Sequence, residues 1–259
     1  MKFTELFSLD GRKALVTGAG RGIGRVLAMS LAQAGCDIAI LEINADDANK
    51  VVEEIKTLGK KAIAFKVDVT KKAEVETAFA ASSKYLGGLD ICINNAGVSY
   101  MEPAEDISEE HFDYVVNTDL KGVFFCCQAA SKLMIPQKKG SIINIASMSG
   151  TIVNYPNKQA IYNTAKAGVI LMTKSLAVEW AKFGIRVNSI SPGYIRTELT
   201  GKRPNGASPA LIEQWESMVP LRRMGNPQEL AGIAIYLASD ASSYTTASDI
   251  IVDGGYTAL

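Results

Sequence analysis

Histidine and paired cysteines are scarce in this chain of 259 residues, which removes several classes of site. The chain has one histidine and four cysteines. With His111 alone, a zinc site of the HExxH type is impossible, and a serine hydrolase triad would lack its GxSxG turn. No cysteine belongs to a CxxC pair, and all lie among apolar residues: Cys36, Cys92, Cys126 and Cys127. We expect no metal site, an exposed helical His111, and buried free thiols in a reducing compartment.

An excess of charge and a long apolar run are also absent. The 27 basic and 27 acidic side chains leave a net charge of zero, so the protein offers no global field to nucleic acid or to an anionic membrane. The longest apolar run, Leu230–Ala238, is about half of what a bilayer span needs. Residues Met1–Asp10 lack the cationic and then apolar pattern of a signal peptide. We therefore predict a cytoplasmic protein without nucleic-acid or membrane partners.

The remaining sequence is typical of a globular α/β protein, with 47% hydrophobic and 21% charged residues. Short runs typical of strands alternate with helical patterns, which predicts a parallel sheet with helices on both faces. Right-handed crossovers make this a single doubly wound sheet of about seven strands. Because no linker divides the chain, we expect one domain over residues 1–259. The expected strands are Lys13–Thr17, Asp37–Leu41, Ala62–Val67, Leu89–Ile93, Ser141–Ala146, Arg186–Ile190 and Asp249–Val252.

Two of the helical patterns have few polar residues. The pattern Ala165–Met172 is apolar except at Lys166, and Tyr114–Ile135 carries only three charges, at Asp119, Lys121 and Lys132. A helix on the outside of a sheet should keep a polar stripe toward water. We therefore predict that a second copy of the chain covers these helices in a symmetric homo-oligomer. Coverage by other helices of the same chain is the alternative.

A glycine-rich turn follows the first expected strand. Gly18, Gly22 and Gly24 are spaced G-x-x-x-G-x-G and open the helical run Arg25–Ala34. Without side chains, the backbone can turn sharply, and a pyrophosphate can approach the free N–H groups at the positive end of the helix dipole. Alone, such a cluster also fits a tight strand-to-helix turn without a ligand.

An acidic residue ends the second expected strand and bears on the choice of cofactor. Glu42 lies 20 residues after Gly22; its carboxylate can accept hydrogen bonds from both adenosine ribose hydroxyls and repels a 2′-phosphate. Arg21, inside the glycine turn, favours the opposite choice, because a cation can pair with that phosphate. Since Glu42 acts at short range, the sequence predicts NAD as the cofactor and leaves NADP as the second choice.

A tyrosine and a lysine share one helix face. Tyr162 and Lys166 stand at positions i and i+4. A free phenol, which titrates at about 10, is a poor base at neutral pH. An ammonium about 4 Å away stabilises a phenolate by roughly 4 kcal/mol at an effective dielectric of about 20, enough for acid–base catalysis near neutral pH. Ser147, after the fifth expected strand, can bond the reacting oxygen. A lone Tyr-x-x-x-Lys pair is common, so it gains meaning only together with the nucleotide turn.

The motifs occur in one order over almost the whole chain: Thr17-Gly18-Ala19-Gly20-Arg21-Gly22-Ile23-Gly24, Asn94-Asn95-Ala96-Gly97, Ser147, Tyr162-Asn163-Thr164-Ala165-Lys166 and Pro192-Gly193. In this combination the chain resembles the classical short-chain dehydrogenase/reductase family. Three stretches resemble the polyol dehydrogenases of that family (galactitol-, arabinitol- and gluconate-type) more narrowly: Ser147–Asn154, Ala177–Ala181 and Pro192–Tyr194. The resemblance implies hydride transfer between a nicotinamide cofactor and a secondary alcohol or ketone.

The resemblance also implies roles for single residues and a tetrameric assembly. The catalytic residues would be Asn117, Ser147, Tyr162 and Lys166, with Asn117 holding a water in a proton relay to Lys166. The cofactor would contact Gly18, Arg21, Gly22, Ile23, Gly24, Glu42, Asp68, Val69, Asn95, Tyr162, Lys166, Pro192, Gly193, Ile195 and Thr197.

Three positions depart from the usual family pattern. Ser147 and Tyr162 are 15 residues apart, slightly more than is typical, Ala146 stands where a second serine is frequent, and Glu42 replaces the commoner aspartate. The longer separation can widen the substrate pocket and leaves the substrate open. None of the departures removes a catalytic group.

The expected substrate pocket is rich in hydroxyls and amides. It would be lined by a loop at residues 192–226, which includes Tyr194, and by Ser147, Ser149, Asn154, Gln159 and Tyr162. Such groups can pair with several substrate hydroxyls without a fixed charge, which favours a polyol or ketose over a long acyl chain. In the alternative, Asn154 and Gln159 only cap a loop and a helix. The rival functions are a 3-oxoacyl thioester reductase that uses NADPH and a non-enzymatic, dinucleotide-sensing scaffold.

Overall fold

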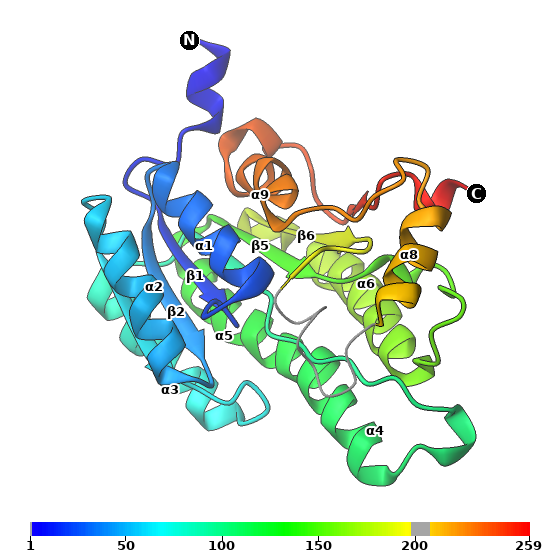
Figure 1. Cartoon of the computed structure of the whole chain (residues 1–259). Coiled ribbons are helices and arrows are strands. Elements are labelled where there is room, and N and C mark those ends of the chain that lie inside the picture. Colours follow the sequence, from blue (N-terminus) through cyan, green and yellow to red (C-terminus); the bar gives the residue numbers. More distant parts are fainter. Residues whose placement is uncertain (1, 198–207) are drawn as a thin grey trace.

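A parallel sheet of seven strands organises the computed structural model, which describes residues 2–197 and 208–259. The strand order β3-β2-β1-β4-β5-β6-β7 starts in the middle of the sheet and winds outward in both directions (Figure 1). This confirms the predicted doubly wound architecture. The strands are β1 (Lys13–Thr17), β2 (Asp37–Glu42), β3 (Ala62–Lys66), β4 (Ile91–Asn94), β5 (Gly140–Ile145), β6 (Ile185–Pro192) and β7 (Asp249–Val252).

The central strands are buried along most of their length because both faces of the sheet are covered. All residues of β4 and β5 are buried, as are most of those in β1 and β6. The observed boundaries differ from the expected ones by up to two residues: β4 begins at Ile91 rather than Leu89, and β6 continues to Pro192. Side-chain patterns show which residues are buried, but not where the backbone pairing between strands ends.

Two helical layers cover the sheet, as predicted. Helices α1, α2 and α9 pack their buried leucines, valines and isoleucines on one face, and α3, α5 and α6 pack on the other (Figure 1). The helices are α1 (Gly22–Gln33), α2 (Ala45–Thr57), α3 (Lys72–Leu86), α4 (Glu109–Val116), α5 (Val123–Gln137), α6 (Ala160–Trp180), α8 (Pro209–Met218) and α9 (Ala231–Ala238).

The stretch at residues 192–226 is only partly the loop that the sequence predicted. It contains helix α8, and residues 198–207 lie outside the described part of the chain. Trp215 of α8 is buried against Met148 and Tyr194, beside the carboxyl ends of β5 and β6. The prolines alone suggested a loop, but Pro209 occupies the first turn of this helix, where a missing N–H costs nothing.

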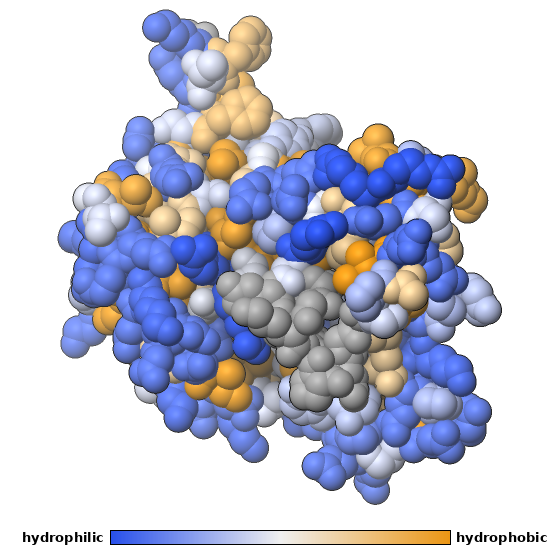
Figure 2. All heavy atoms as spheres, viewed as in Figure 1, coloured by the Kyte–Doolittle hydropathy of each residue, from blue (hydrophilic) through white to orange (hydrophobic). Residues whose placement is uncertain are grey.

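Some apolar side chains of the two unusual helices are exposed. Phe124 on α5 and Leu171 and Val178 on α6 are exposed by 40%, 67% and 77%, so other helices of the same chain do not cover them. The N-terminal turn η1 (Phe3–Phe7) also projects from the body and carries apolar side chains, whereas hydrophilic side chains cover most of the neighbouring surface (Figure 2). A homo-oligomer that covers α5 and α6 therefore stays a prediction.

The cysteines and the histidine lie in different surroundings. All four cysteines are buried free thiols, as expected, and burial raises the pKa of Cys36 to about 12. The expectation of an exposed His111 is wrong: the residue is half-buried on α4, and its Nδ1 lies 2.8 Å from the Glu102 carboxylate. The Tyr100 ring packs against the imidazole with centroids 4.0 Å apart. None of the described helices combines the length and the apolar character that a bilayer crossing requires.

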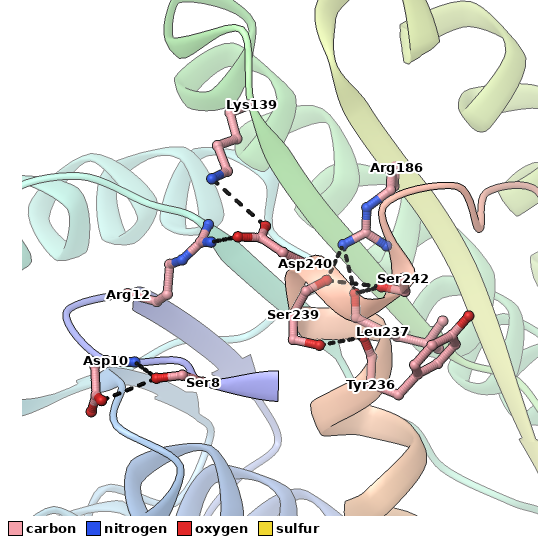
Figure 3. A network of polar contacts seen from close by, with 10 residues as sticks. All are labelled: Ser8, Asp10, Arg12, Lys139, Arg186, Tyr236, Leu237, Ser239, Asp240 and Ser242. Atoms are coloured by element: carbon pink, nitrogen blue, oxygen red, sulfur yellow. Dashed lines mark hydrogen bonds and ion pairs between the residues drawn. The ribbon is translucent and has the colours of Figure 1, made fainter. Parts of the chain in front are cut away.

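A network of polar contacts lies at the amino edge of the sheet (Figure 3). The candidate site lies at the opposite, carboxyl edge. Arg186 of β6 donates to the carbonyls of Leu237, Ser239 and Thr245 at 2.9, 3.2 and 3.4 Å. It therefore satisfies carbonyls at the end of α9 that have no partner within the helix. Asp240 lies next to this point and pairs with Arg12 at 2.7 Å and with Lys139 at 3.8 Å.

We expect Arg186→Met to lower the free energy of unfolding by about 2 kcal/mol, because carbonyls at the end of α9 lose a charged donor. Chemical denaturation measures this change. Lys139→Met is the matched control, since it removes one cation of an exposed pair in the same network and should change stability by less than about 0.5 kcal/mol. Equal midpoints for wild type and Arg186→Met would contradict the role given to the guanidinium.

Candidate active site

One cavity of about 640 Å³ lies at the carboxyl edge of the sheet and brings the predicted residues together. All the residues predicted to be catalytic or to contact substrate line it, and so do the predicted cofactor residues apart from Gly24. In a doubly wound sheet this edge is where loops from neighbouring strands diverge and leave a crevice. The predicted residues thus lie together in one region of the molecule, and their individual roles stay predictions.

The glycine turn between β1 and the first turn of α1, residues 18–24, forms a concave stretch of backbone that is called the cradle. Gly18 and Gly22 have φ values of 63° and 57°, which disfavour any residue with a side chain. A Cβ on Gly24 would lie 2.2 Å from the Gly18 carbonyl oxygen, so Gly24 lets the helix pack against the turn rather than lining the cavity. Helix α1 begins at Gly22, and the residue before it, Arg21, makes no side-chain cap. The first N–H groups of α1 thus fit an anionic pyrophosphate.

The side chain of Asn95 holds this turn in place through two hydrogen bonds. Its side-chain amide donates to the carbonyl oxygens of Thr17 and Gly18 at 3.1 and 2.9 Å. The resemblance placed Asn95 at the adenosine part of the cofactor, and that contact stays a prediction. The bonds in the structure make Asn95 a brace that holds the loop after β4 against the loop after β1.

Two carboxylates lie at the ends of β2 and β3, as the sequence indicated. Glu42 accepts hydrogen bonds from the backbone N–H groups of Gly20 at 3.0 Å, Ile43 at 2.9 Å and Asn44 at 3.2 Å. Asp68 accepts from the backbone and the hydroxyl of Thr70. Because Glu42 touches the glycine turn itself, its negative charge lies within the cradle.

Ser147, Tyr162 and Lys166 meet on the other side of the cavity. Ser147 stands two residues after the end of β5, and its hydroxyl oxygen accepts from the backbone N–H of Ser149 at 3.2 Å. Tyr162 and Lys166 are one turn apart on α6, with the Lys166 ammonium 5.6 Å from the centre of the Tyr162 ring. The ammonium donates to the Ile145 carbonyl at the end of β5 at 3.1 Å. Strand β5 thus positions both the serine and the lysine.

Asp119, rather than Asn117, is in contact with Lys166. Its carboxylate lies 3.1 Å from the Lys166 ammonium, and both side chains are buried. Asn117 lines the cavity, but the contact of its side-chain oxygen is with Lys121, at 3.4 Å. The predicted relay through Asn117 therefore stays a prediction, and the sequence reasoning missed Asp119.

Asn117 and Asp119 both belong to a π-helical turn. Residues Asn117–Gly122 form this turn between α4 and α5. A π-turn inserts one extra residue per turn and changes which side chains face inward. A signal for Asp119 was present in the sequence: it and Lys166 are opposite charges on two helical patterns with few polar residues, and buried charges are paired.

The ion pair changes the titration of the lysine. Burial works to lower the pKa of Lys166, but the charge of Asp119, followed by the phenol of Tyr162, outweighs it, and the net shift is upward. Lys166 is therefore a cation throughout the neutral range. A fixed cation next to a phenol is the arrangement that acid–base catalysis by tyrosine requires.

A cluster of polar side chains, called the amide cluster below, lies next to Ser147, and all its members except Asn163 line the cavity. It consists of Ser149, Asn154, Gln159 and Asn163. The Gln159 amide nitrogen lies 3.1, 2.8 and 3.1 Å from the oxygens of Ser149, Asn154 and Asn163. Gln159 occupies the N-cap position of α6, but its side chain makes no cap hydrogen bond there and bonds the cluster instead.

The sequence reasoning placed Tyr194 in the pocket but did not single out Trp215, with which it forms an aromatic wall. The rings of Tyr194 and Trp215 stack with centroids 4.6 Å apart, and the Trp215 indole donates to Asn157 at 3.2 Å. Both rings line the cavity. No local pattern pairs these residues, because one follows β6 and the other lies on α8.

We expect Gly24→Ala to weaken dinucleotide binding at least about tenfold, because the new methyl group cannot fit beside the Gly18 carbonyl without moving the turn. Calorimetric titration of the purified protein with the cofactor measures the affinity. Gly232→Ala on α9 is the matched control, since a Cβ there meets nothing within 4 Å. Unchanged affinity in Gly24→Ala would show that the cradle is not the binding site.

Comparison with known proteins identifies the family. A family model described as enoyl-(acyl carrier protein) reductase matches residues 18–257. A probable NADP-dependent mannitol dehydrogenase of Yarrowia lipolytica is 45% identical over 97% of this chain and 90% of its own length. Sorbose reductase of Candida albicans is 46% identical over 98% of this chain and 89% of its own length.

The solved structures agree with these relatives. A short-chain type dehydrogenase/reductase from Mycobacterium marinum superposes with a TM-score of 0.95 at 44% identity, over the full length of both chains. A nicotinamide cofactor is thus supported. The predicted preference for NAD is not, since the Yarrowia relative is named as NADP-dependent. The chain belongs to the short-chain dehydrogenase/reductase family and is an oxidoreductase that acts on alcohol or ketone groups with a nicotinamide cofactor.

Proposed function

We propose that the protein interconverts a secondary hydroxyl of a polyol with the corresponding ketose. The observation that carries this proposal is the convergence of Ser147, Tyr162 and Lys166 on one cavity whose adjoining wall is the amide cluster. The relatives named mannitol dehydrogenase and sorbose reductase support the same substrate class.

The chemistry follows from what each side chain can hold or release. During oxidation, the Tyr162 phenolate takes the proton of the alcohol O–H, the C–H bond of the same carbon breaks, and a ketone forms. Ser147 donates to the reacting oxygen and fixes its place, and the Lys166 ammonium stabilises the phenolate. When bound, the dinucleotide supplies the hydride acceptor for oxidation and the hydride donor for reduction. In the reductive direction Tyr162 returns the proton.

Binding of the substrate rests on uncharged groups. The side chains of Ser149, Asn154 and Gln159 are buried and already oriented by their mutual hydrogen bonds. Hydroxyl and amide groups can donate to and accept from vicinal hydroxyls, and the stacked Tyr194 and Trp215 offer an apolar wall to the C–H groups of the substrate. These features suit a polyhydroxylated chain of a few carbons.

A reductase for acyl thioesters is the second candidate, because the matching family model carries the description of an acyl carrier protein reductase. Two observations weigh against it. The amide cluster places polar groups where an acyl chain needs an apolar surface, and the curated relatives compared above act, by their names, on mannitol and sorbose. A dinucleotide-sensing scaffold without activity is disfavoured because Ser147, Tyr162 and Lys166 all line one cavity.

We keep NAD as the proposed cofactor, against the NADP-dependence in the name of the Yarrowia relative. The support is the position of Glu42: its carboxylate is bonded to the backbone of Gly20 inside the cradle. A 2′-phosphate on the adenosine ribose would meet this charge at short range. Arg21 lines the same cavity and favours NADP, because its guanidinium can pair with a 2′-phosphate.

We further infer that the chain works as one domain in a homo-oligomer, with a tetramer as the expected form. The exposed Leu171 and Val178 on α6 support a covering partner. The buried free thiols are compatible with the reducing cytoplasm.

Tyr162→Phe should reduce kcat by about a thousandfold, because it removes the group that transfers the proton, and should leave cofactor affinity nearly unchanged. Steady-state oxidation of a panel of hexitols and pentitols, and reduction of the matching ketoses, measures this loss. Tyr244→Phe is the control, since it removes the same hydroxyl from a fully exposed ring. Turnover that survives in Tyr162→Phe would refute the assignment.

Faster turnover of 3-oxoacyl thioesters than of any polyol or ketose in the wild type would favour the second candidate.

Glu42→Ala should reduce the ratio of kcat/KM with NAD to kcat/KM with NADP by about tenfold or more, because the charge that repels the 2′-phosphate is lost. Glu42→Gln should act similarly while retaining an oxygen that accepts from the turn, which separates charge from turn geometry. Glu53→Ala, an exposed carboxylate on α2, is the control. A wild-type enzyme that already prefers NADP would show that the ribose argument is wrong.

A further inference from the structure

The buried ion pair at the base of the site links three segments of the chain. The Lys166 ammonium on α6 lies 3.1 Å from the Asp119 carboxylate in the π-turn, and the two side chains are exposed by 5% and 0%. The second carboxylate oxygen of Asp119 accepts from the backbone N–H of Val98 at 2.7 Å, in the loop after β4. Asp119 thus joins the π-turn, the loop after β4 and the catalytic helix.

The packing around the pair leaves little room for other positions of the ammonium. A Cβ on Gly97 would lie 3.2 Å from the Asp119 carboxylate and 3.4 Å from the Lys166 ammonium. The ammonium also donates a hydrogen bond to the Ile145 carbonyl. Lys166 is therefore held between a carboxylate and a carbonyl that belong to different elements.

A buried ammonium needs such a partner. Removing a charged amine from water favours its neutral form, and a neutral amine no longer stabilises a phenolate. The Ile145 carbonyl is a dipole and offsets only part of this cost, whereas a carboxylate at contact distance offsets much more. Burial is the largest influence on Lys166 and lowers its pKa, and the charge of Asp119 is the largest that raises it.

We propose that Asp119 is a positioning residue that keeps the Lys166 ammonium charged and in place below Tyr162, so that proton transfer depends on this carboxylate as well as on the lysine. The inference deepens the proposed function and rests on it, because it assigns Asp119 a part in the same reaction.

Few other charges face this pair from the elements packed against α6. In the described lining of the cavity, α4 contributes Asp113 and Tyr114, which are exposed, and the segment after β6 contributes Tyr194. The turn η4 (Met148–Gly150), after β5, has no titratable side chain. At the cofactor end of the cavity stand Arg21, Glu42 and Asp68.

The remaining charges of these elements do not line the cavity. Lys132 of α5 pairs with Glu76, and Arg186 of β6 binds carbonyls at the amino edge of the sheet. Lys121 of the π-turn and Lys174, Glu179 and Lys182 at the end of α6 and beyond are exposed. Asp119 is thus the one buried carboxylate among the described residues that contacts the lysine.

The test compares Asp119→Asn with the wild type by two measurements. The first is the pH profile of kcat for oxidation of the best polyol. We expect its alkaline limit to move down by about one to three pH units in Asp119→Asn, because the unpaired Lys166 loses its proton earlier. At acidic pH, where Lys166 stays charged, the variant should retain most of its kcat. Glu179→Gln is the control: it removes an exposed carboxylate of α6 that does not line the cavity and should leave the profile in place.

The second measurement needs no turnover. The ¹³Cε chemical shift of Lys166 in lysine-labelled protein, assigned by its loss in Lys166→Met, reports the charge of the amine directly. We expect Lys166 to remain protonated to higher pH in the wild type than in Asp119→Asn. Should Asp119→Asn not fold, the wild-type titration alone decides: a Lys166 that loses its proton near neutral pH overturns the proposal.

The remaining outcomes distinguish a failure of the proposal for Asp119 from a failure of the proposed function. An unchanged Lys166 titration in Asp119→Asn overturns the proposal, and so does a kcat loss that is equal at every pH, because that pattern indicates a merely structural role. If the wild type turns over no polyol or ketose, the proposed function fails, while the Lys166 titration still decides whether Asp119 keeps the ammonium charged.

Discussion

A buried ammonium imposes the constraint on which the arrangement of the site depends. Lys166 must stay charged to assist a phenol, yet it lies almost wholly inside the protein. Three elements meet this need together: α6 carries the lysine, the end of β5 offers the Ile145 carbonyl, and the π-turn before α5 offers Asp119. The π-turn is thus part of this arrangement, because it carries both Asp119, whose carboxylate meets Lys166, and Asn117, whose side chain contacts Lys121.

The cofactor side of the cavity is built mainly from backbone. Its shape comes from glycines that turn sharply or let two segments touch, from the first N–H groups of α1, and from Asn95, which braces the turn through its side-chain amide. The substrate side is built from side chains that bond one another, with the amide cluster on one wall and stacked aromatic rings on the other. Backbone N–H groups suffice to bind a pyrophosphate, whereas selection among substrates needs side chains with specific hydrogen-bonding groups.

Local patterns were sufficient for the parts of the site that lie within one segment. The glycine turn follows from spacing along seven residues, and the Tyr162–Lys166 pair follows from the helical repeat. Where two segments meet, these patterns failed. Asn117 came from the family resemblance and Asp119 was not singled out, while Trp215 lies on α8, in a stretch that the sequence predicted to be a loop. His111 was expected to be exposed since its neighbours along the chain are polar, but Glu102 and Tyr100 cover it in the folded protein.

By itself, the amino-acid sequence determined the doubly wound parallel sheet, the nucleotide turn and the identity of the serine, tyrosine and lysine at its carboxyl edge. These follow from short-range periodicity and from chemistry carried by neighbouring residues, which the folded state preserves. Only the tertiary structure decided which carboxylate pairs with Lys166, how Ser149, Asn154 and Gln159 bond one another, and which apolar side chains remain uncovered. Such contacts join residues from different elements, and their distances depend on how those elements pack rather than on any spacing along the chain.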